Sequence, residues 1–357
     1  MYDLNRWGRR LVPVLIACSV ITGCGGDGRI PVTVYSPHGR DQLLLLEHAF
    51  EARRPDIDVR WLYMGSQEVL DRIRFERVNP QADVWFGGPA AIFQRGVEDS
   101  LLAPYRPSFA DAVDPDATGP GDLYYPVYRT PAVIAFNSDA VSREEAPHDW
   151  DEVLEPRWTG KVLIRDPVAS GTMRAIWGLI IQRHMRAPGD TAPGMAWLRR
   201  LDGQTAAYTL NPAVLDQKLA RQEGLITLWD LPDILISRGK GMPFDYVFPE
   251  SGTVVINDAI ALVRGSDHPQ AAKAFIDYVG STEAQILAAR EVFRLPARLD
   301  LPPDSVPAWV AEVDREMKTA SVDWDLLARE GASWMGYWDQ HVRGTGVAPT
   351  AGRGRDQ

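Results

Sequence analysis

The sequence is poor in the groups that catalyse reactions or cross-link a chain. Its 357 residues include only two cysteines, Cys18 and Cys24, both close to the N-terminus. No disulfide is therefore expected in the folded part. The six histidines are scattered, and no two have the spacing of metal ligands. Gly-x-Ser-x-Gly, His-Glu-x-x-His and P-loop motifs are absent. The sequence thus predicts no catalytic residues, no metal site and no cofactor.

Positive charge is also scarce relative to negative charge. Lysine and arginine total 38 against 48 aspartates and glutamates, which gives a formal net charge of -10. Such a chain repels nucleic acid and anionic lipid surfaces, so we expect no nucleic-acid partner. The hydrophobic content of 45% is typical of a globular protein. The chain is longer than a single hydrophobic core usually supports, which favours two lobes.

Long apolar runs are lacking as well. The run from Leu11 to Ile21 is shorter than the roughly 20 residues that span a bilayer. Three arginines precede it and small residues follow, which is the layout of a secretory signal. The last four residues of this region, Ile-Thr-Gly-Cys24, resemble a bacterial lipobox. This resemblance implies a signal peptide over 1–23, lipidation of Cys24 and a tether over 24–28. We therefore expect a lipid-anchored protein on the periplasmic side of a bacterial membrane. An ordinary cleaved signal with an incidental cysteine is the alternative.

Strand and helix patterns alternate along the chain. Residues 30–35, 58–63 and 82–86 read as strands, and 41–52 has apolar residues at helical spacing. This alternation predicts an α/β fold with mostly parallel sheets rather than an all-β domain. Residues 124–137 read as an extended segment that crosses between the lobes. The glycine- and arginine-rich stretch 344–357 is predicted to be a disordered tail.

Five segments in a fixed order resemble one known family. They are VTVYSPHG (32–39), QADVWFGGP (81–89), PVYRTPAVIAFN (126–137), DPVASGTMRAIWGLI (166–180) and SGTVVINDAIALVRGSDHPQAAKAFIDYVGSTEAQ (251–285). Together they resemble the extracellular solute-binding proteins of bacterial ABC importers, in the subgroup that binds ferric ion, phosphonates and sugar phosphates. The resemblance implies the type II two-lobed periplasmic-binding-protein fold, with extended hinge strands and a ligand cleft. It also implies a monomer that binds a small molecule without catalysis, with a membrane permease and its ATPase as partners.

The expected domain boundaries follow this pattern. We assign 29–127 and 258–300 to lobe 1, and 133–252 and 301–343 to lobe 2. The hinge is expected at 128–132 and 253–257.

Candidate ligand-binding residues of lobe 1 follow its predicted strands, because ligands of open α/β sheets bind at the carboxyl ends of strands. The hydroxyl, imidazole and free backbone amides of these loops suit an anion near a helix N-terminus. A helix cap, a solvated side chain or a tight turn is the alternative in each case. The residues are Ser36, His38, Gly39, Ser66 and Gly88.

In lobe 2, Ser170, Gly171 and Thr172 open a predicted helix and suit a phosphate or carboxylate. Plain capping is the alternative. In the crossing segment, Arg129 beside Thr130 is the preferred cation for the ligand, with a surface ion pair as the alternative.

Trp229 and Asp230 occupy the place where the resemblance puts the adjacent tyrosines of ferric-binding relatives. This chain has no tyrosine pair there, so iron becomes an alternative ligand. An aspartate beside an aromatic residue suits an ammonium or a hydroxyl network. Asp258 interrupts a predicted strand and is either a ligand-binding residue or part of a bulge. The sequence thus predicts capture of a small phosphate- or phosphonate-containing solute. The alternatives are a ferric-iron carrier, or an enzyme or sensor on the same fold.

Overall fold

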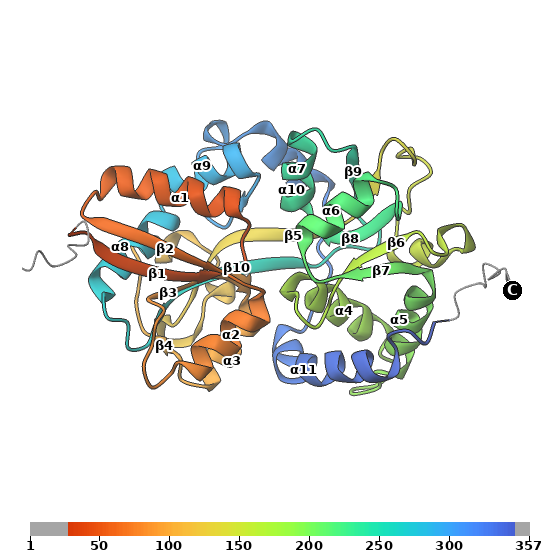
Figure 1. The fold of residues 1–357 in the computed structure, drawn as a ribbon, viewed down its shortest axis with the longest axis horizontal. Helices are drawn as coiled ribbons and strands as arrows, with labels where there is room; N and C mark the ends of the chain where they lie inside the picture. The colour runs from red at the N-terminus through yellow and green to blue at the C-terminus, as the bar shows by residue number, and fades with distance from the viewer. Residues whose placement is uncertain (1–27, 347–357) are drawn as a thin grey trace, which may run out of the picture.

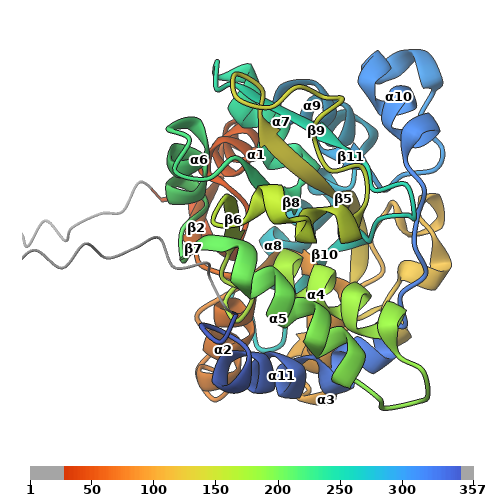
Figure 2. The same cartoon turned by 90° about the vertical axis from the view of Figure 1, so that its right-hand side faces the viewer.

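The structure is a computed structural model that describes residues 28–346. Strands from two lobes follow one another in the order β2-β1-β3-β10-β5-β8-β6-β7 (Figure 1). We use lobe 1 for the part around β1–β3 and lobe 2 for the part around β6–β8. Figure 2 views the molecule from the side of lobe 2. None of the helices in 28–346 is long and apolar enough to cross a membrane.

Lobe 1 is built on three parallel strands and one antiparallel strand. Val32 and Val34 of the first strand are fully buried, as its alternation of β-branched residues predicts. The strands are β1 (Ile30–Ser36), β2 (Ile57–Tyr63), β3 (Val84–Pro89) and β10 (Val255–Val263), with the short β4 (Leu102–Ala103) at the end of β10. The helices are α1 (Arg40–Arg53), α2 (Ser66–Phe75), α3 (Ala90–Glu98), α8 (Pro269–Val279) and α9 (Thr282–Val292).

Lobe 2 repeats the arrangement with its own core. The apolar helix α4 (Gly171–His184) is buried along most of its length, as its sequence predicts. The strands are β6 (Val162–Arg165), β7 (Thr205–Thr209), β8 (Ile226–Asp230) and β9 (Phe244–Val247). The other helices are α5 (Ala192–Gln204), α6 (Pro212–Ala220), α7 (Leu231–Gly239), α10 (Ala308–Glu316) and α11 (Trp324–His341).

The long strand β5 (Tyr125–Asn137) belongs to both lobes. Its first part pairs with β10 up to Pro131, and its second part pairs with β8 from Ala132 onward. The short β11 (Leu295–Pro296) also pairs with the first part. At the changeover, the Thr253 hydroxyl donates to the carbonyl oxygen of Ala132 at 2.6 Å. The assignment of 128–132 and 253–257 as a hinge concerns motion and stays a prediction, as do the lobe boundaries.

The C-terminal helix α11 contacts both lobes. Trp334 and Trp338 pack in the lobe 2 core, while Leu327 faces Ile92 of α3 across a narrow apolar cavity. After α11, the amides of Gly344 and Gly346 donate to the Asp202 carboxylate at 3.0 and 2.7 Å. Residues 344–346, which the sequence placed in a disordered tail, are therefore held against lobe 2. The predicted signal peptide, Cys24 and most of the tether lie outside the described residues.

Candidate functional site: the cleft between the lobes

A cavity of about 70 Å³ lies between the two lobes, and we call it the inner cavity. The carboxyl ends of β1, β2, β3, β6 and β8 all reach it, as expected for ligand sites of open α/β sheets. Lobe 1 and the strands that leave it contribute Pro37, His38, Gly39, Tyr63, Gly65, Ser66, Gly88, Pro89, Thr130, Asp258 and Arg294. Lobe 2 contributes Arg165, Ser170, Gly171, Thr172, Pro212, Trp229, Asp230 and Asp233.

Helix N-termini from opposite lobes meet at this cavity. Helices α1 and α2 begin after Gly39 and Gly65, and neither glycine supplies a side-chain cap. Helix α4 begins after Ser170, whose hydroxyl accepts a hydrogen bond from the Met173 amide at 3.2 Å. The first amides of a helix lack acceptors within it and form the positive end of its dipole. The inner cavity is therefore a favourable place for an anion.

The lobes touch closely beside these helix starts. A Cβ atom on Gly171 of lobe 2 would lie 2.7 Å from Pro89 Cδ and 2.9 Å from Ser66 Oγ of lobe 1. A Cβ atom on Gly65 would lie 2.9 Å from the carbonyl oxygen of Ala169. Any larger residue at Gly171 would push the lobes apart, because the opposing Pro89 ring is rigid.

A hydrogen bond also joins the lobes at this edge. The Arg174 guanidinium of α4 donates to the Gln67 side chain of α2 at 2.6 Å. Burial, together with the charge of nearby Arg95, lowers the pKa of Arg174 to about 10. Arg174 thus stays protonated at neutral pH, and its hydrogen bond to Gln67 links the two lobes.

Buried carboxyl groups form one wall of the inner cavity. Asp230 caps α7 by accepting from the Asp233 amide at 3.1 Å. Asp258 accepts from the Gly88 amide at 3.0 Å and from the Thr130 hydroxyl. Burial raises the pKa of Asp230 well above its usual value, and the neighbouring charge of Asp233 adds to this rise. Burial also raises the pKa of Asp258, while Arg294 opposes the rise in both groups.

Two buried arginines line the same cavity, one from each lobe. Arg294 is 4% exposed, approaches Asp233 at 3.5 Å, and its Nε has no partner among the described residues. Arg165 donates to the carbonyl oxygen of Thr209 at 3.1 Å, and its Nε also has no partner among the described residues. Burial lowers the pKa of Arg165. A buried guanidinium with an unused donor is a strong candidate to bind an oxyanion.

His38 adds an unpaired nitrogen to the same cavity. Its side chain is 5% exposed, its ring centroid lies 4.7 Å from that of Phe86, and Nε2 has no partner in the described chain. Burial lowers the pKa of His38 well below its usual value, and the charge of Arg294 lowers it further. His38 is therefore neutral at pH 7 and offers a hydrogen bond rather than a charge.

The structure brings together most of the residues selected from the sequence. Those that line the inner cavity are His38, Gly39, Ser66, Gly88, Thr130, Ser170, Gly171, Thr172, Trp229, Asp230 and Asp258. Several of them also have the structural role that the sequence left open, such as a helix cap or a strand bulge. Ser170 caps α4, and Asp258 lies where the pairing of β10 shifts register, which marks a bulge.

Two selected residues lie elsewhere. Arg129 donates to the Asp314 carboxylate at 2.8 Å and to the carbonyl oxygen of Pro296 at 3.0 Å, away from the inner cavity. Successive side chains of a strand point to opposite faces, so Arg129 points away when its neighbour Thr130 lines the cavity. Ser36 is fully buried, and its hydroxyl accepts from the His38 amide at 3.1 Å. Ser36 shapes the turn rather than lining the cavity.

Sequence reasoning missed both cavity arginines. Arg165 ends β6, so the strand-end rule that selected Ser36 applies to it equally. Arg294 follows α9 and has no such signal. It lies far along the chain from the other cavity residues, and only the folded arrangement brings it to them.

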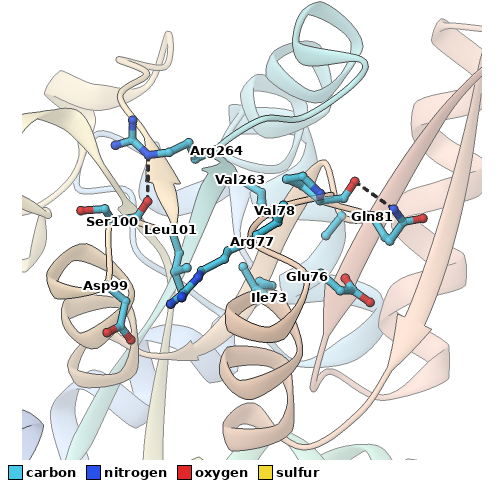
Figure 3. A pocket seen from close by; sticks show the side chains of 12 residues that line it. Ile73, Glu76, Arg77, Val78, Gln81, Asp99, Ser100, Leu101, Val263 and Arg264 are labelled. Carbon is cyan, nitrogen blue, oxygen red and sulfur yellow. Dashed lines mark hydrogen bonds between the residues drawn. The ribbon is translucent and has the colours of Figure 1, made fainter.

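A larger cavity of about 310 Å³ lies within lobe 1 (Figure 3). The ends of α2 and α3 and of β10 surround it, with Ile73, Leu101 and Val263 among its apolar residues. Residues of lobe 2 do not reach it, so lobe closure does not shape this cavity.

The described residues offer few grouped metal ligands. Within residues 28–346, no group of three or more histidine, cysteine, aspartate or glutamate side chains is placed to hold a metal ion. Trp229, at the place implied for a tyrosine ligand of iron, donates its indole N–H to Asp233 at 3.3 Å. The adjacent tyrosines that the resemblance implies for ferric iron are therefore not present at this position.

Residues 79–329 match the family described as bacterial extracellular solute-binding protein. The chain belongs to this family. A probable ABC transporter periplasmic-binding protein of Sinorhizobium fredii is 26% identical over 87% of this chain and 86% of its own length. A putative 2-aminoethylphosphonate-binding periplasmic protein of Salmonella typhimurium is 26% identical over 79% of this chain and 78% of its own length.

Solved structures show the same fold. The periplasmic binding protein AfuA from Actinobacillus pleuropneumoniae, with fructose-6-phosphate bound, has a TM-score of 0.76 at 22% identity and covers 89% of this chain and 99% of its own. Iron-bound HitA from Pseudomonas aeruginosa has a TM-score of 0.71 at 19% identity and covers 86% of this chain and 98% of its own. The predicted periplasmic-binding-protein fold is therefore confirmed. Membership in a solute-binding family also confirms that this component of an ABC importer is not an enzyme.

Proposed function

We propose that this solute-binding protein captures a small solute with a phosphate or phosphonate group between its lobes and delivers it to a membrane permease. The observation that carries this proposal is the convergence of unused donors. Helix N-termini from both lobes meet Arg165 and Arg294 in one cavity, and each arginine keeps an unpaired Nε. A tetrahedral oxyanion has enough acceptors to accept from all of them.

The strength of such a site follows from ordinary magnitudes. A charge near a helix N-terminus gains typically 0.3–1 kcal/mol, and up to ~2 kcal/mol when it is partly buried. A hydrogen bond to a charged group contributes roughly 1.5–3 kcal/mol. Two arginines and the start of α4 together contribute roughly 3–8 kcal/mol, and the upper end of this range corresponds to micromolar affinity.

The acidic wall of the cavity favours a ligand with a second polar group. Asp230 and Asp258 line the same cavity as the arginines, so a hydroxyl group beside the anionic head can donate to these carboxyl groups. The phosphonate-binding relative and the fructose-6-phosphate-bound structure support this class of ligand.

Ferric iron is the second candidate, because iron-binding proteins are also among the structural relatives. Relatives of this chain differ in their ligands, so the choice of an anion rests on the donors in the inner cavity. Paired arginines beside helix N-termini favour an oxyanion over a bare cation.

A thermal-shift screen tests the proposed function. Inorganic phosphate, methylphosphonate, 2-aminoethylphosphonate, glucose 6-phosphate and Fe(III) are each added to the purified protein. A ligand at a hundred times its Kd stabilises the folded state by about 2.7 kcal/mol, which raises the Tm by roughly 4 °C for a chain of this size. At least one phosphate or phosphonate should give this shift without being consumed. A shift with Fe(III) alone would favour the iron alternative.

We also infer that Cys24 carries a lipid that anchors the protein at the membrane. The support is the lipobox-like sequence before it and the periplasmic relatives. Cys24→Ser is expected to abolish incorporation of labelled fatty acid and to release the protein or leave its precursor uncleaved. Cys18→Ser is the matched control and should be labelled normally. Fatty acid that still enters the Cys24→Ser form would show that the anchor lies elsewhere.

A further inference from the structure

The inner cavity continues into a much larger groove between the lobes. This groove has a volume of about 730 Å³ and lies between α1 of lobe 1 and the helices α6 and α7 of lobe 2 (Figure 1). The two spaces are continuous, because six residues line both: Pro37, Gly39, Tyr63, Pro212, Asp233 and Arg294.

We propose that the groove is a second subsite, which holds a neutral, hydroxyl-bearing tail of the same solute whose anionic group occupies the inner cavity. The preferred ligand is then a phosphate or phosphonate with a polyol tail, rather than free phosphate or a short aminophosphonate. This inference rests on the proposed function and specifies its ligand class.

Size is the first support. The inner cavity, at about 70 Å³, has room for a head group and little else, whereas the adjoining groove is about 730 Å³. The passage between them runs past Tyr63 and Arg294, which line both spaces. A solute bound by its head in the inner cavity would extend its tail along this passage.

An unpaired buried amide is the second support. Gln42 of α1 lines the groove and is 1% exposed, and neither its Nε2 nor its Oε1 has a hydrogen bond of normal geometry within the described residues. The Tyr128 hydroxyl, which also lacks such a bond, lies close enough to interact with the amide. A buried amide without partners is costly, so such groups normally have a bonding partner. Its NH₂ donates and its oxygen accepts, and a hydroxyl group can do both in return.

The charges of the groove are the third support, because most are already neutralised. Lys240 pairs with Asp41 across the lobes, and Arg294 pairs with Asp233 at 3.5 Å. Asp216 accepts from the Ser237 hydroxyl at 2.7 Å, and because burial raises its pKa only to about 6, its carboxylate stays mostly ionised at pH 7. Asp216 and the exposed Arg40 are the lining charges with no ion pair within 28–346, and they are of opposite sign. A neutral tail therefore fits this lining better than a charged one.

Titration calorimetry on the purified protein compares pairs of ligands that share the same anionic group and differ in the tail attached to it. Glucose 6-phosphate is expected to bind at least about tenfold more tightly than inorganic phosphate, which corresponds to one or two net hydrogen bonds. 2-Aminoethylphosphonate should gain less than roughly threefold over methylphosphonate, because the groove favours neutral groups. Equal affinities of phosphate and glucose 6-phosphate, or a larger gain from the amine, would overturn the inference. Failure of all four compounds to bind would overturn the proposed function together with it.

Two neighbouring tryptophan substitutions locate the effect. Ala213 lines the groove at the start of α6, whereas Val214 next to it is 42% exposed and does not line the groove. In Ala213→Trp the ratio of the phosphate and glucose 6-phosphate affinities should fall to about one, since the indole fills the space of the tail. Val214→Trp should keep the ratio of the unmodified protein. An unchanged ratio in Ala213→Trp would show that the tail lies outside the groove.

Discussion

Arg294→Gln is expected to weaken the binding of methylphosphonate by roughly a hundredfold, since a charge-assisted hydrogen bond contributes about 1.5–3 kcal/mol and the attraction between charges is lost with it. Arg294 is buried, lines the inner cavity and has an unpaired Nε. Titration calorimetry measures the change directly. The affinity of Arg294→Lys should lie between those of the unmodified protein and Arg294→Gln, because lysine keeps the charge but loses the planar fork of donors.

Arg129→Gln is the matched control for this prediction. Arg129 is the arginine that sequence reasoning preferred, but it pairs with Asp314 outside the inner cavity. Its loss should leave the affinity for methylphosphonate within roughly threefold, as expected for a partly exposed ion pair outside the inner cavity. Arg294→Gln also removes a cation facing Asp230 and Asp258, so thermal unfolding must show that the variant is folded. A folded Arg294→Gln protein that binds as tightly as the unmodified protein would remove this arginine from the site.

Gly171→Val is expected to keep the lobes apart and to weaken ligand binding by roughly a hundredfold or more, because overpacking at a closed contact costs several kcal/mol. The added Cβ would lie 2.7 Å from the rigid Pro89 ring and 2.9 Å from Ser66 Oγ. Small-angle X-ray scattering should show a larger radius of gyration with the ligand present, and calorimetry should show the loss of affinity.

Gly336→Val tests whether this effect is local to the lobe contact. Gly336 lies in α11, and a Cβ atom built there meets nothing within 4 Å. This variant should keep the scattering profile and affinity of the unmodified protein. Tight binding by Gly171→Val in a compact form would show that closure does not pass through the contact between Gly171 and Pro89.

The strands and helices around the inner cavity were predictable because their signals are local. Val32 and Val34 in β1 alternate with polar residues, and the loop after this strand contains glycine and histidine. Ser170 before the apolar α4 is a typical N-cap, and its hydroxyl does cap the helix. Because carboxyl ends of parallel strands share one edge of a sheet, these local signals also predict that the loops meet.

The positions of the cavity arginines were not predictable in the same way. Arg294 reaches the site because the segment after α9 returns to β5 through β11 and lies against Asp233 of α7. That path depends on tertiary packing, which leaves no periodic signal in the sequence. Arg129 failed for the opposite reason, since strand alternation was available and places it on the face opposite Thr130.

A crystal structure of the protein with methylphosphonate bound would show whether the inner cavity holds the anion. We expect phosphonate oxygens within hydrogen-bond distance, about 2.7–3.2 Å, of the first amides of α4 and of the guanidiniums of Arg165 and Arg294. A phosphonate bound on the surface, or in the lobe 1 cavity beside Ile73 and Leu101 with the cleft between the lobes left unoccupied, would contradict this expectation.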